Sequence, residues 1–115
     1  MSLYDERVLP NNPLEFIKEC VIDRRILWTY HVNMRMKKRS ISRQQVLDAV
    51  ATYEVIESYP EDKYLPSYLV YAQHQKVVFH ILFAVDIIEK NVRVITAYYP
   101  NTTYWDNDLK TRRKP

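Results

Sequence analysis

The sequence predicts an α+β domain in which N-terminal helices pack on a four-stranded antiparallel sheet. Apolar residues recur at helical spacing before residue 54 and follow strand-like patterns after it. The connections between the later segments are short, which favours antiparallel neighbours. At 115 residues the chain is long enough for one hydrophobic core and too short for two.

The first predicted helix covers residues 13–25 and follows an irregular lead-in over residues 1–12. Asn12 and Pro13 have the residue types preferred at a helix N-cap and at the first helical position. Its apolar residues recur at i, i+3 and i+7, and these are Leu14, Ile17 and Val21. Such spacing is typical of a helix with one buried face.

Two more helices are expected after residues 26–30, an apolar and partly β-branched stretch that we interpret as a break or a packed linker. Residues 31–39 have the length of a short helix. Ser42 then begins the segment SISRQQVLDAVATY, and Gln45 three residues later completes an S-x-x-Q capping box. The segment therefore predicts a helix that ends near Tyr53.

Four strands are predicted from there on, and the third is apolar enough to lie centrally with both faces covered. They cover residues 54–59, 67–73, 76–85 and 92–99. Pro60 and Pro100 end the first and the last of them. We expect one domain over residues 13–105, followed by a basic C-terminal tail over residues 106–115.

Composition excludes several classes of function. The chain contains no glycine, so phosphate-binding loops, dinucleotide-binding turns and nucleophile elbows are ruled out. Cys20 is the sole cysteine, and the histidines lack zinc-ligand spacing, so we expect no disulfide, metal or cofactor and a reducing cytoplasm. The stretch MSLYDERVLP lacks the apolar core of a signal peptide, and no apolar run is long enough to span a membrane.

Positive charge is concentrated between Arg24 and Val46, where seven residues are Lys or Arg and none is Asp or Glu. On a helix, His31, Arg35 and Lys38 share one face, and Arg39 lies just beside it. Cations with a titratable imidazole suit a polyanion such as RNA, with the imidazole placed for proton transfer. The alternative is a solvated helix face with no binding role.

Two residues of the predicted sheet allow two interpretations each. His80 lies within the most apolar strand, on the same face as Leu82 and Ala84, where a hydrogen-bonded buried histidine is commoner than a catalyst. A catalytic role would become the favoured interpretation if that face lined a cleft under the basic helix. Tyr98 can donate a proton or stack on a base, and it can equally fill space in a strand.

Four segments resemble one bacterial family of unknown-function domains related to the BrnT toxin. The segment Thr29–Ser42 is similar to its H-x-x-x-R-M-x-x-R-x-I-S signature, and Glu54–Pro60 to a strand reading E-V-I-E-x-Y-P. Ile95–Pro100 matches I-T-x-Y-x-P, and Trp105 follows it as in the family. The resemblance implies a RelE/BrnT-like fold, with helices on one side of a small antiparallel sheet.

The resemblance also implies an activity. Relatives with this fold are toxins of toxin–antitoxin pairs, small basic endoribonucleases that often act on messenger RNA, in some cases on the ribosome, and are inhibited by a cognate antitoxin. The implied catalytic residues are the base or acid His31, the phosphate clamps Arg35 and Arg39, and the supporting donor Tyr98. The implied RNA contacts are Lys37, Lys38 and Arg43. Two alternatives remain, namely a non-catalytic module that binds nucleic acid or protein, and a metal-independent enzyme that acts on a small phosphorylated substrate.

Overall fold

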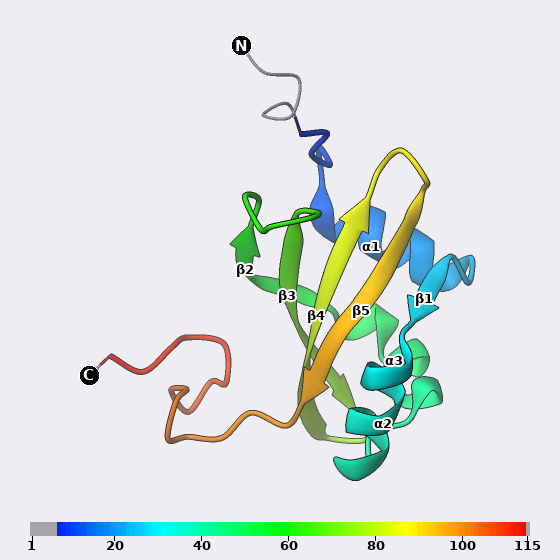
Figure 1. Cartoon of the computed structure of the whole chain (residues 1–115). Coiled ribbons are helices and arrows are strands. Elements are labelled where there is room, and N and C mark those ends of the chain that lie inside the picture. The colour runs from blue at the N-terminus through cyan, green and yellow to red at the C-terminus, as the bar shows by residue number, and fades with distance from the viewer. Residues whose placement is uncertain (1–6, 115) are drawn as a thin grey trace.

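A computed structural model describes residues 7–114, which form a mixed α+β domain with a five-stranded sheet (Figure 1). The strand order across the sheet is β1-β5-β4-β3-β2. In chain order the elements are α1 (Pro13–Ile22), β1 (Ile26–Trp28), α2 (Tyr30–Lys38), α3 (Arg43–Asp48), a 3-10 turn (Val50–Thr52), β2 (Glu54–Tyr59), β3 (Ser67–His74), β4 (Val77–Asp86) and β5 (Asn91–Tyr98). The predicted α+β class is confirmed, whereas the prediction of a four-stranded, purely antiparallel sheet is wrong.

The fifth strand is β1, which lies in the stretch interpreted as a break or linker. Its three residues pair in parallel with β5, and Ile26 lies opposite Val92. A parallel edge strand of this length cannot be recognised from alternation, because its partner is far away in the sequence. The β1–β5 pairing makes the sheet mixed, and it places the start of α2 next to β5 (Figure 1).

Each helix begins after a capping side chain, and the sequence predicts the caps of α1 and α3 but not Thr29, the cap of α2. The side-chain oxygen of Asn12 accepts a hydrogen bond from Glu15 N at 3.1 Å, and that of Thr29 accepts one from Val32 N at 3.1 Å. Ser42 Oγ likewise accepts from Gln45 N at 2.9 Å, which forms half of the predicted capping box. The Gln45 side chain does not return to the cap and instead donates to the Tyr99 hydroxyl at 3.4 Å.

Strands β2 to β5 form a continuous antiparallel meander, as predicted. The side chains of β4 alternate between two faces of the sheet. On the helix side, Phe79, Ile81 and Phe83 are buried in the core with apolar residues of all three helices, such as Ile17, Val32 and Val46. The opposite face, which we call the open face because no helix of the described chain covers it, carries His80, Leu82 and Ala84.

The lack of glycine leaves other residues to adopt left-handed backbone conformations. Arg24 and Ser40 have φ of 62° and 58° just after α1 and α2, where glycine is usual. Gln75 and Lys76 turn the β3–β4 hairpin with φ of 50° and 67°. Leu109 has φ of 58° in the C-terminal segment, an uncommon conformation for a bulky residue.

Candidate functional site

A row of basic side chains runs along the exposed face of α2, as the spacing predicts. His31, Arg35, Lys38 and Arg39 are all exposed. The opposite face of the helix carries Val32 and Met36, which are buried in the core. We call these four residues the basic row.

Arg39 connects the basic row to the sheet through hydrogen bonds. Its Nη1 donates hydrogen bonds to Thr96 Oγ1 at 3.2 Å and to the carbonyl of Ala97 at 2.8 Å. Both acceptors belong to β5, so the C-terminal end of α2 lies against this strand. Thr96 points to the open face, because it pairs with Leu82 in the β4–β5 register.

Of the remaining predicted RNA contacts, Lys37 belongs to α2 and Arg43 is the first residue of α3. Both line a shallow groove of about 400 Å³ between the end of α2 and the start of α3. Arg43 is held in place, because its Nε donates to Asn33 Oδ1 at 2.9 Å and its guanidinium lies 5.2 Å from the centre of the Trp28 ring. This surface adds positive charge next to the basic row.

The cations of this region lack carboxylate partners. The four ion pairs among residues 7–114 join Arg25 to Asp23, Arg93 to Asp86, Lys110 to Glu54 and Arg112 to Glu57. The basic residues of α2 and its C-terminal end take part in none of them. Part of this charge stabilises the helix, because three of these cations lie in its last turn near the negative end of its dipole.

Tyr98 lies on the open face, where its side chain bonds to His80 rather than to a residue of the basic row. Its hydroxyl is 3.1 Å from Nδ1 of His80 on the neighbouring strand. Burial raises the pKa of Tyr98, so the phenol keeps its proton at neutral pH. The structure therefore brings Tyr98 together with His80 and not with His31 or Arg35, which lie on α2. Arg39 contacts β5 at the carbonyl of Ala97, the residue before Tyr98.

His80 is buried on the open face rather than in the helix-side core. Its relative exposure is 0%. Its Nε2 lies 2.7 Å from the carbonyl of Leu109, and its ring meets that of Trp105 edge to face at 4.6 Å. Both bonds are satisfied by neutral imidazole, with Nε2–H donating to Leu109 and the Tyr98 hydroxyl donating to Nδ1. Residues of the C-terminal segment thus cover this histidine, which is hydrogen-bonded and buried as expected, although it lies on the open face.

An ion pair and a short network surround this histidine. Arg112 donates to both carboxylate oxygens of Glu57, at 2.9 and 3.2 Å, and the Tyr59 hydroxyl donates to the same carboxylate. Burial alone would raise the pKa of Glu57, but the hydrogen bonds from Arg112 and Tyr59 outweigh it and lower the pKa. Glu57 therefore stays ionised beside the buried imidazole.

Sequence reasoning did not single out Glu57, Tyr59 or Arg112 as members of a site. Their assembly depends on the β2–β3–β4 register and on the path of the chain after Pro100, and neither leaves a local sequence pattern. The available signal was the E-V-I-E-x-Y-P segment, which contains Glu57 and Tyr59 two residues apart on one strand face.

A groove of about 440 Å³ opens on the open face near the start of α2. It is bounded by the helix cap Thr29, by Ala84 and Arg93 of the sheet, and by Lys63 and Tyr64 of the β2–β3 loop. Tyr64 is 84% exposed, and Lys63 Nζ lies 5.2 Å from the centre of its ring. Asp62 lines it too, so the groove combines charged side chains of both signs with an exposed aromatic ring.

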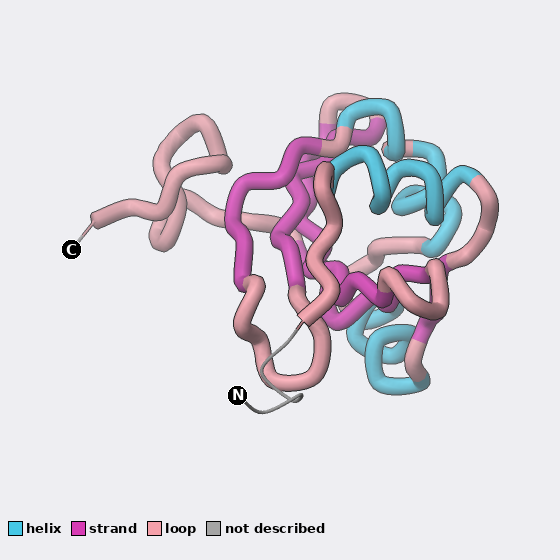
Figure 2. The backbone as a smooth tube through the Cα atoms, turned by 90° about the horizontal axis from the view of Figure 1, so that it is seen from above, coloured by secondary structure: helices cyan, strands magenta, loops and turns pink. Residues whose placement is uncertain are grey.

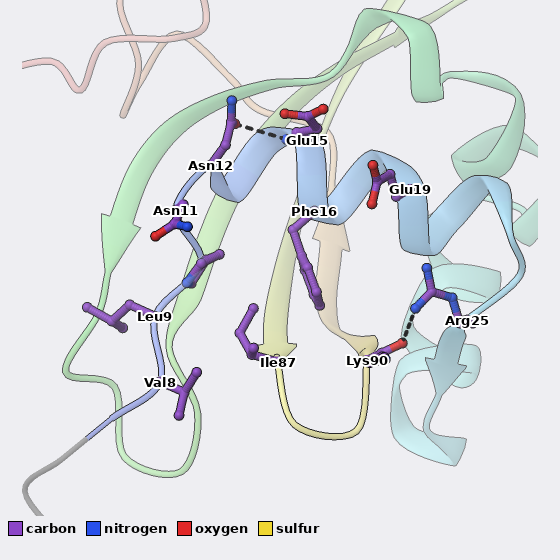
Figure 3. Close-up of a pocket in the computed structure, with 11 residues that line it drawn as sticks. Val8, Leu9, Asn11, Asn12, Glu15, Phe16, Glu19, Arg25, Ile87 and Lys90 are labelled. Atoms are coloured by element: carbon purple, nitrogen blue, oxygen red, sulfur yellow. Dashed lines mark hydrogen bonds between the residues drawn. The ribbon is translucent and has the colours of Figure 1, made fainter.

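Another cavity, of about 730 Å³, lies beside α1 (Figure 3). Apolar Phe16 and Ile87 line it together with the charged Glu15 and Glu19 (Figure 3). Arg25 donates to the carbonyl of Lys90 at its edge, at 2.9 Å. None of the predicted site residues lines this cavity.

No group of three or more metal-ligating side chains occurs in the described part of the chain. No helix within residues 7–114 is long and apolar enough to cross a membrane. His80 has partners for both ring nitrogens, and Asn91 Oδ1 is the one buried side-chain polar atom without a hydrogen bond among the described residues.

Comparison with known proteins identifies the family. Residues 28–99 match the domain of unknown function DUF4258, so the chain belongs to this family. The match includes the basic row, His80 and Tyr98, and it ends before Trp105 and Arg112. No curated protein and no solved structure matches the chain.

The environment of His80 predicts a pH-dependent stability. Burial lowers the pKa of His80 below its usual value of 6.5, and this outweighs the opposing hydrogen bond to Leu109. The folded protein then binds fewer protons than the unfolded chain, so its free energy of unfolding falls as the pH drops through about 6.5. We expect His80→Gln to reduce the difference in urea-unfolding free energy between about pH 7.5 and about pH 5.5.

His74→Gln is the matched control, because it replaces a histidine at the end of β3, away from this network. A His80→Gln variant with the full pH dependence of the wild type would contradict the assignment of the effect to His80.

Proposed function

We propose that this member of the DUF4258 family binds single-stranded RNA along α2 and cleaves it without a metal ion, as the toxin of a toxin–antitoxin pair. The observation that carries the proposal is the basic row, a line of exposed cations with no carboxylate partner in the described chain, beside the open face of a sheet. Phosphate groups would supply the missing negative charge.

Arginine at two of the row's positions supports phosphate as the ligand. A guanidinium binds two phosphate oxygens at once, which an ammonium group cannot do. Arg35 and Arg39 are four residues apart, so their side chains emerge from the same side of α2. The hydrogen bonds of Arg39 to Thr96 and Ala97 hold its guanidinium at the edge of the open face and reduce the side-chain entropy lost on binding.

Bases of the same strand would lie on the open face. The groove bounded by Thr29 and Tyr64 begins where α2 begins, and Tyr64 offers a ring on which a base can stack. Arg93 lines this groove as well, and its guanidinium pairs with Asp86 at 3.4 Å. Stacking on exposed rings favours single strands over duplexes, because duplex bases are already stacked on each other.

Cleavage would use His31 as the base. Neutral imidazole takes the proton of a ribose 2′-hydroxyl, the 2′-oxygen bonds to the adjacent phosphorus, and the bond from phosphorus to the 5′-oxygen breaks. Arg35 and Arg39 stabilise the added charge on the phosphoryl oxygens. Water or an imidazolium protonates the leaving 5′-oxygen, which leaves a 2′,3′-cyclic phosphate and a 5′-hydroxyl.

The toxin role follows from the resemblance of the α2 and β5 segments to BrnT-related domains. A ribonuclease that acts on messenger RNA in the cytoplasm, with or without the ribosome, arrests growth unless a partner blocks it. An acidic antitoxin would bind the same cations as the RNA, so inhibition and substrate binding would compete.

A second candidate function is RNA binding without cleavage. One observation favours it, namely that the Tyr98 hydroxyl is bonded to His80 and is therefore unavailable as a proton donor beside His31. Under this alternative the basic row and the groove keep their binding roles, and His31 does not act as a catalytic base.

We expect the double variant Arg35→Gln/Lys38→Gln to weaken binding of a single-stranded RNA oligonucleotide by about tenfold at low salt. Each lost phosphate contact also makes the slope of log affinity against log salt concentration shallower by about 0.7. Fluorescence anisotropy over a salt series measures both quantities.

The matched control is Lys18→Gln/Lys76→Gln, which removes the same charge from α1 and from the β3–β4 turn. Equal losses of affinity in the two double variants would mean that RNA responds to net charge alone, and the basic row would not be the binding site.

We expect His31→Ala to lower the rate of RNA cleavage by about a hundredfold or more, with RNA affinity nearly unchanged, because it removes the base. The same substitution should relieve growth arrest on expression. His74→Ala is the control for loss of a histidine, and circular dichroism verifies that both variants fold.

Cleavage at the wild-type rate by His31→Ala would refute the assigned base. A wild-type protein that binds RNA but neither cleaves it nor arrests growth would favour the non-catalytic alternative.

A further inference from the structure

The C-terminal segment covers the part of the open face that surrounds His80. Residues 101–114, here called the strap, contain no helix or strand and lie on the side of the sheet away from the helices (Figure 2). Trp105 is 3% exposed, and the Leu109 carbonyl bonds to His80. Without the strap, the imidazole of His80 would face solvent.

Trp105 occupies a position with the properties of a base-binding site. Its flat bicyclic ring is close in size to a purine. One side meets His80 edge to face at 4.6 Å, and the guanidinium of Arg112 lies 4.5 Å from the ring centre. Aromatic rings and arginine planes are the groups on which proteins stack unpaired bases. Beneath it, His80 and Tyr98 remain bonded to each other through Nδ1.

The strap is folded mainly on itself. Asp106 N donates to the Thr111 carbonyl at 2.8 Å, Arg113 N donates to the Tyr104 carbonyl at 2.9 Å, and Asp108 accepts three bonds from Lys110 and Thr111. These bonds would survive if the strap left the sheet as a unit.

The attachments of the strap to the sheet are few and mostly at the surface. Lys110 Nζ pairs with Glu54 at 2.7 Å, and Arg112 pairs with Glu57, with both cationic side chains more than a third exposed. Exposed ion pairs contribute little to stability and are screened by salt. The deeper attachments are the Trp105 ring and the Leu109 carbonyl.

The backbone at Leu109 is strained in the attached state. Its φ of 58° is left-handed, a conformation that bulky residues rarely adopt. The carbonyl that bonds to His80 belongs to this residue. Leu109 N also donates to the Asp106 carbonyl at 2.9 Å, so this left-handed conformation belongs to the internal fold of the strap.

The covered position adjoins the proposed RNA path. Thr96 and Tyr98 lie two residues apart on one face of β5, and Arg39 of the basic row bonds to Thr96. An RNA strand whose phosphates contact Arg39 would therefore bring a base towards His80 and Tyr98.

We propose that the strap is an autoinhibitory cover, and that an unpaired RNA base takes the place of the Trp105 ring when the strap lifts. The inference rests on the proposed RNA binding. It adds that the attached strap competes with RNA for the open face, so the affinity for RNA scales with the fraction of molecules in which the strap is released.

The sharpest test is Lys110→Gln/Arg112→Gln, which removes both strap-to-sheet ion pairs. Because the variant loses two positive charges, simple electrostatics predicts weaker RNA binding. The cover predicts the opposite, an affinity at least about threefold tighter than wild type in fluorescence anisotropy with a single-stranded oligonucleotide. The control Lys76→Gln/Lys114→Gln removes equal charge without touching these pairs, and should bind more weakly than wild type.

A second variant separates the effect of lost positive charge from the effect of removing the Trp105 ring from the covered position. Trp105→Ala leaves every charge in place and empties the covered position, and it should also bind RNA more tightly. A readout without RNA is the rate at which diethyl pyrocarbonate modifies His80, located by mass spectrometry. This rate should rise in Lys110→Gln/Arg112→Gln and stay at the wild-type value in the control.

The inference is overturned alone if wild type binds RNA and both strap variants bind it more weakly, or if His80 stays as protected in them as in wild type. If wild type and all variants fail to bind RNA, the proposed function is overturned, together with the RNA base as the occupant of the covered position.

Discussion

The parallel pairing of β1 with β5 determines where α2 lies. Three residue pairs join the strands, from Ile26 opposite Val92 to Trp28 opposite Val94. Thr29, the next residue, is the N-cap of α2, so no loop separates the strand from the helix. The helix must therefore run beside β5, with Val32 and Met36 in the core. Its exposed side then carries the basic row along the sheet edge, and Arg39 completes the attachment at Thr96 and Ala97.

The two faces of the sheet are covered by different means. Helices bury the face that carries Phe79, Ile81 and Phe83, and this apolar packing supplies most of the driving force for folding. The strap covers the other face around His80 through one aromatic ring, a carbonyl and two exposed ion pairs. The helices are a permanent part of the fold, whereas we propose that the strap can detach from the sheet. The proposed RNA binding and its proposed control by the strap would thus use the same face.

Local sequence patterns predicted most of the elements. Predicted caps located the starts of α1 and α3, and the spacing of residues 31–39 located α2, because these features lie within a few residues of one another. Strands β2 to β5 followed from alternation and from the prolines that end two of them. The edge strand β1 was missed, because three residues show no usable period and the partner strand is more than sixty residues away. Long-range pairing of this kind has no local signal.

The candidate site, like the fold, was predictable only where it depends on residues close together in the sequence. Helical spacing alone brought His31, Arg35, Lys38 and Arg39 to one face of α2. The His80–Tyr98 contact and the Glu57–Arg112 pair required the strand register and the path of the strap, so they emerged only from the structure. His80 shows the difference well: it was correctly expected to be hydrogen-bonded and buried, yet the covering groups come from the C-terminal segment rather than from the helix-side core.

The most direct test of the account is an NMR titration of the arginine Nε–H resonances with a single-stranded RNA oligonucleotide at low salt. If the basic row is the phosphate-binding surface, the resonances of Arg35 and Arg39 shift together with one dissociation constant, while that of Arg24, at the far end of α1, stays in place. Shifts at Arg24 with unchanged Arg35 and Arg39 would contradict the account, because the RNA would then bind away from α2.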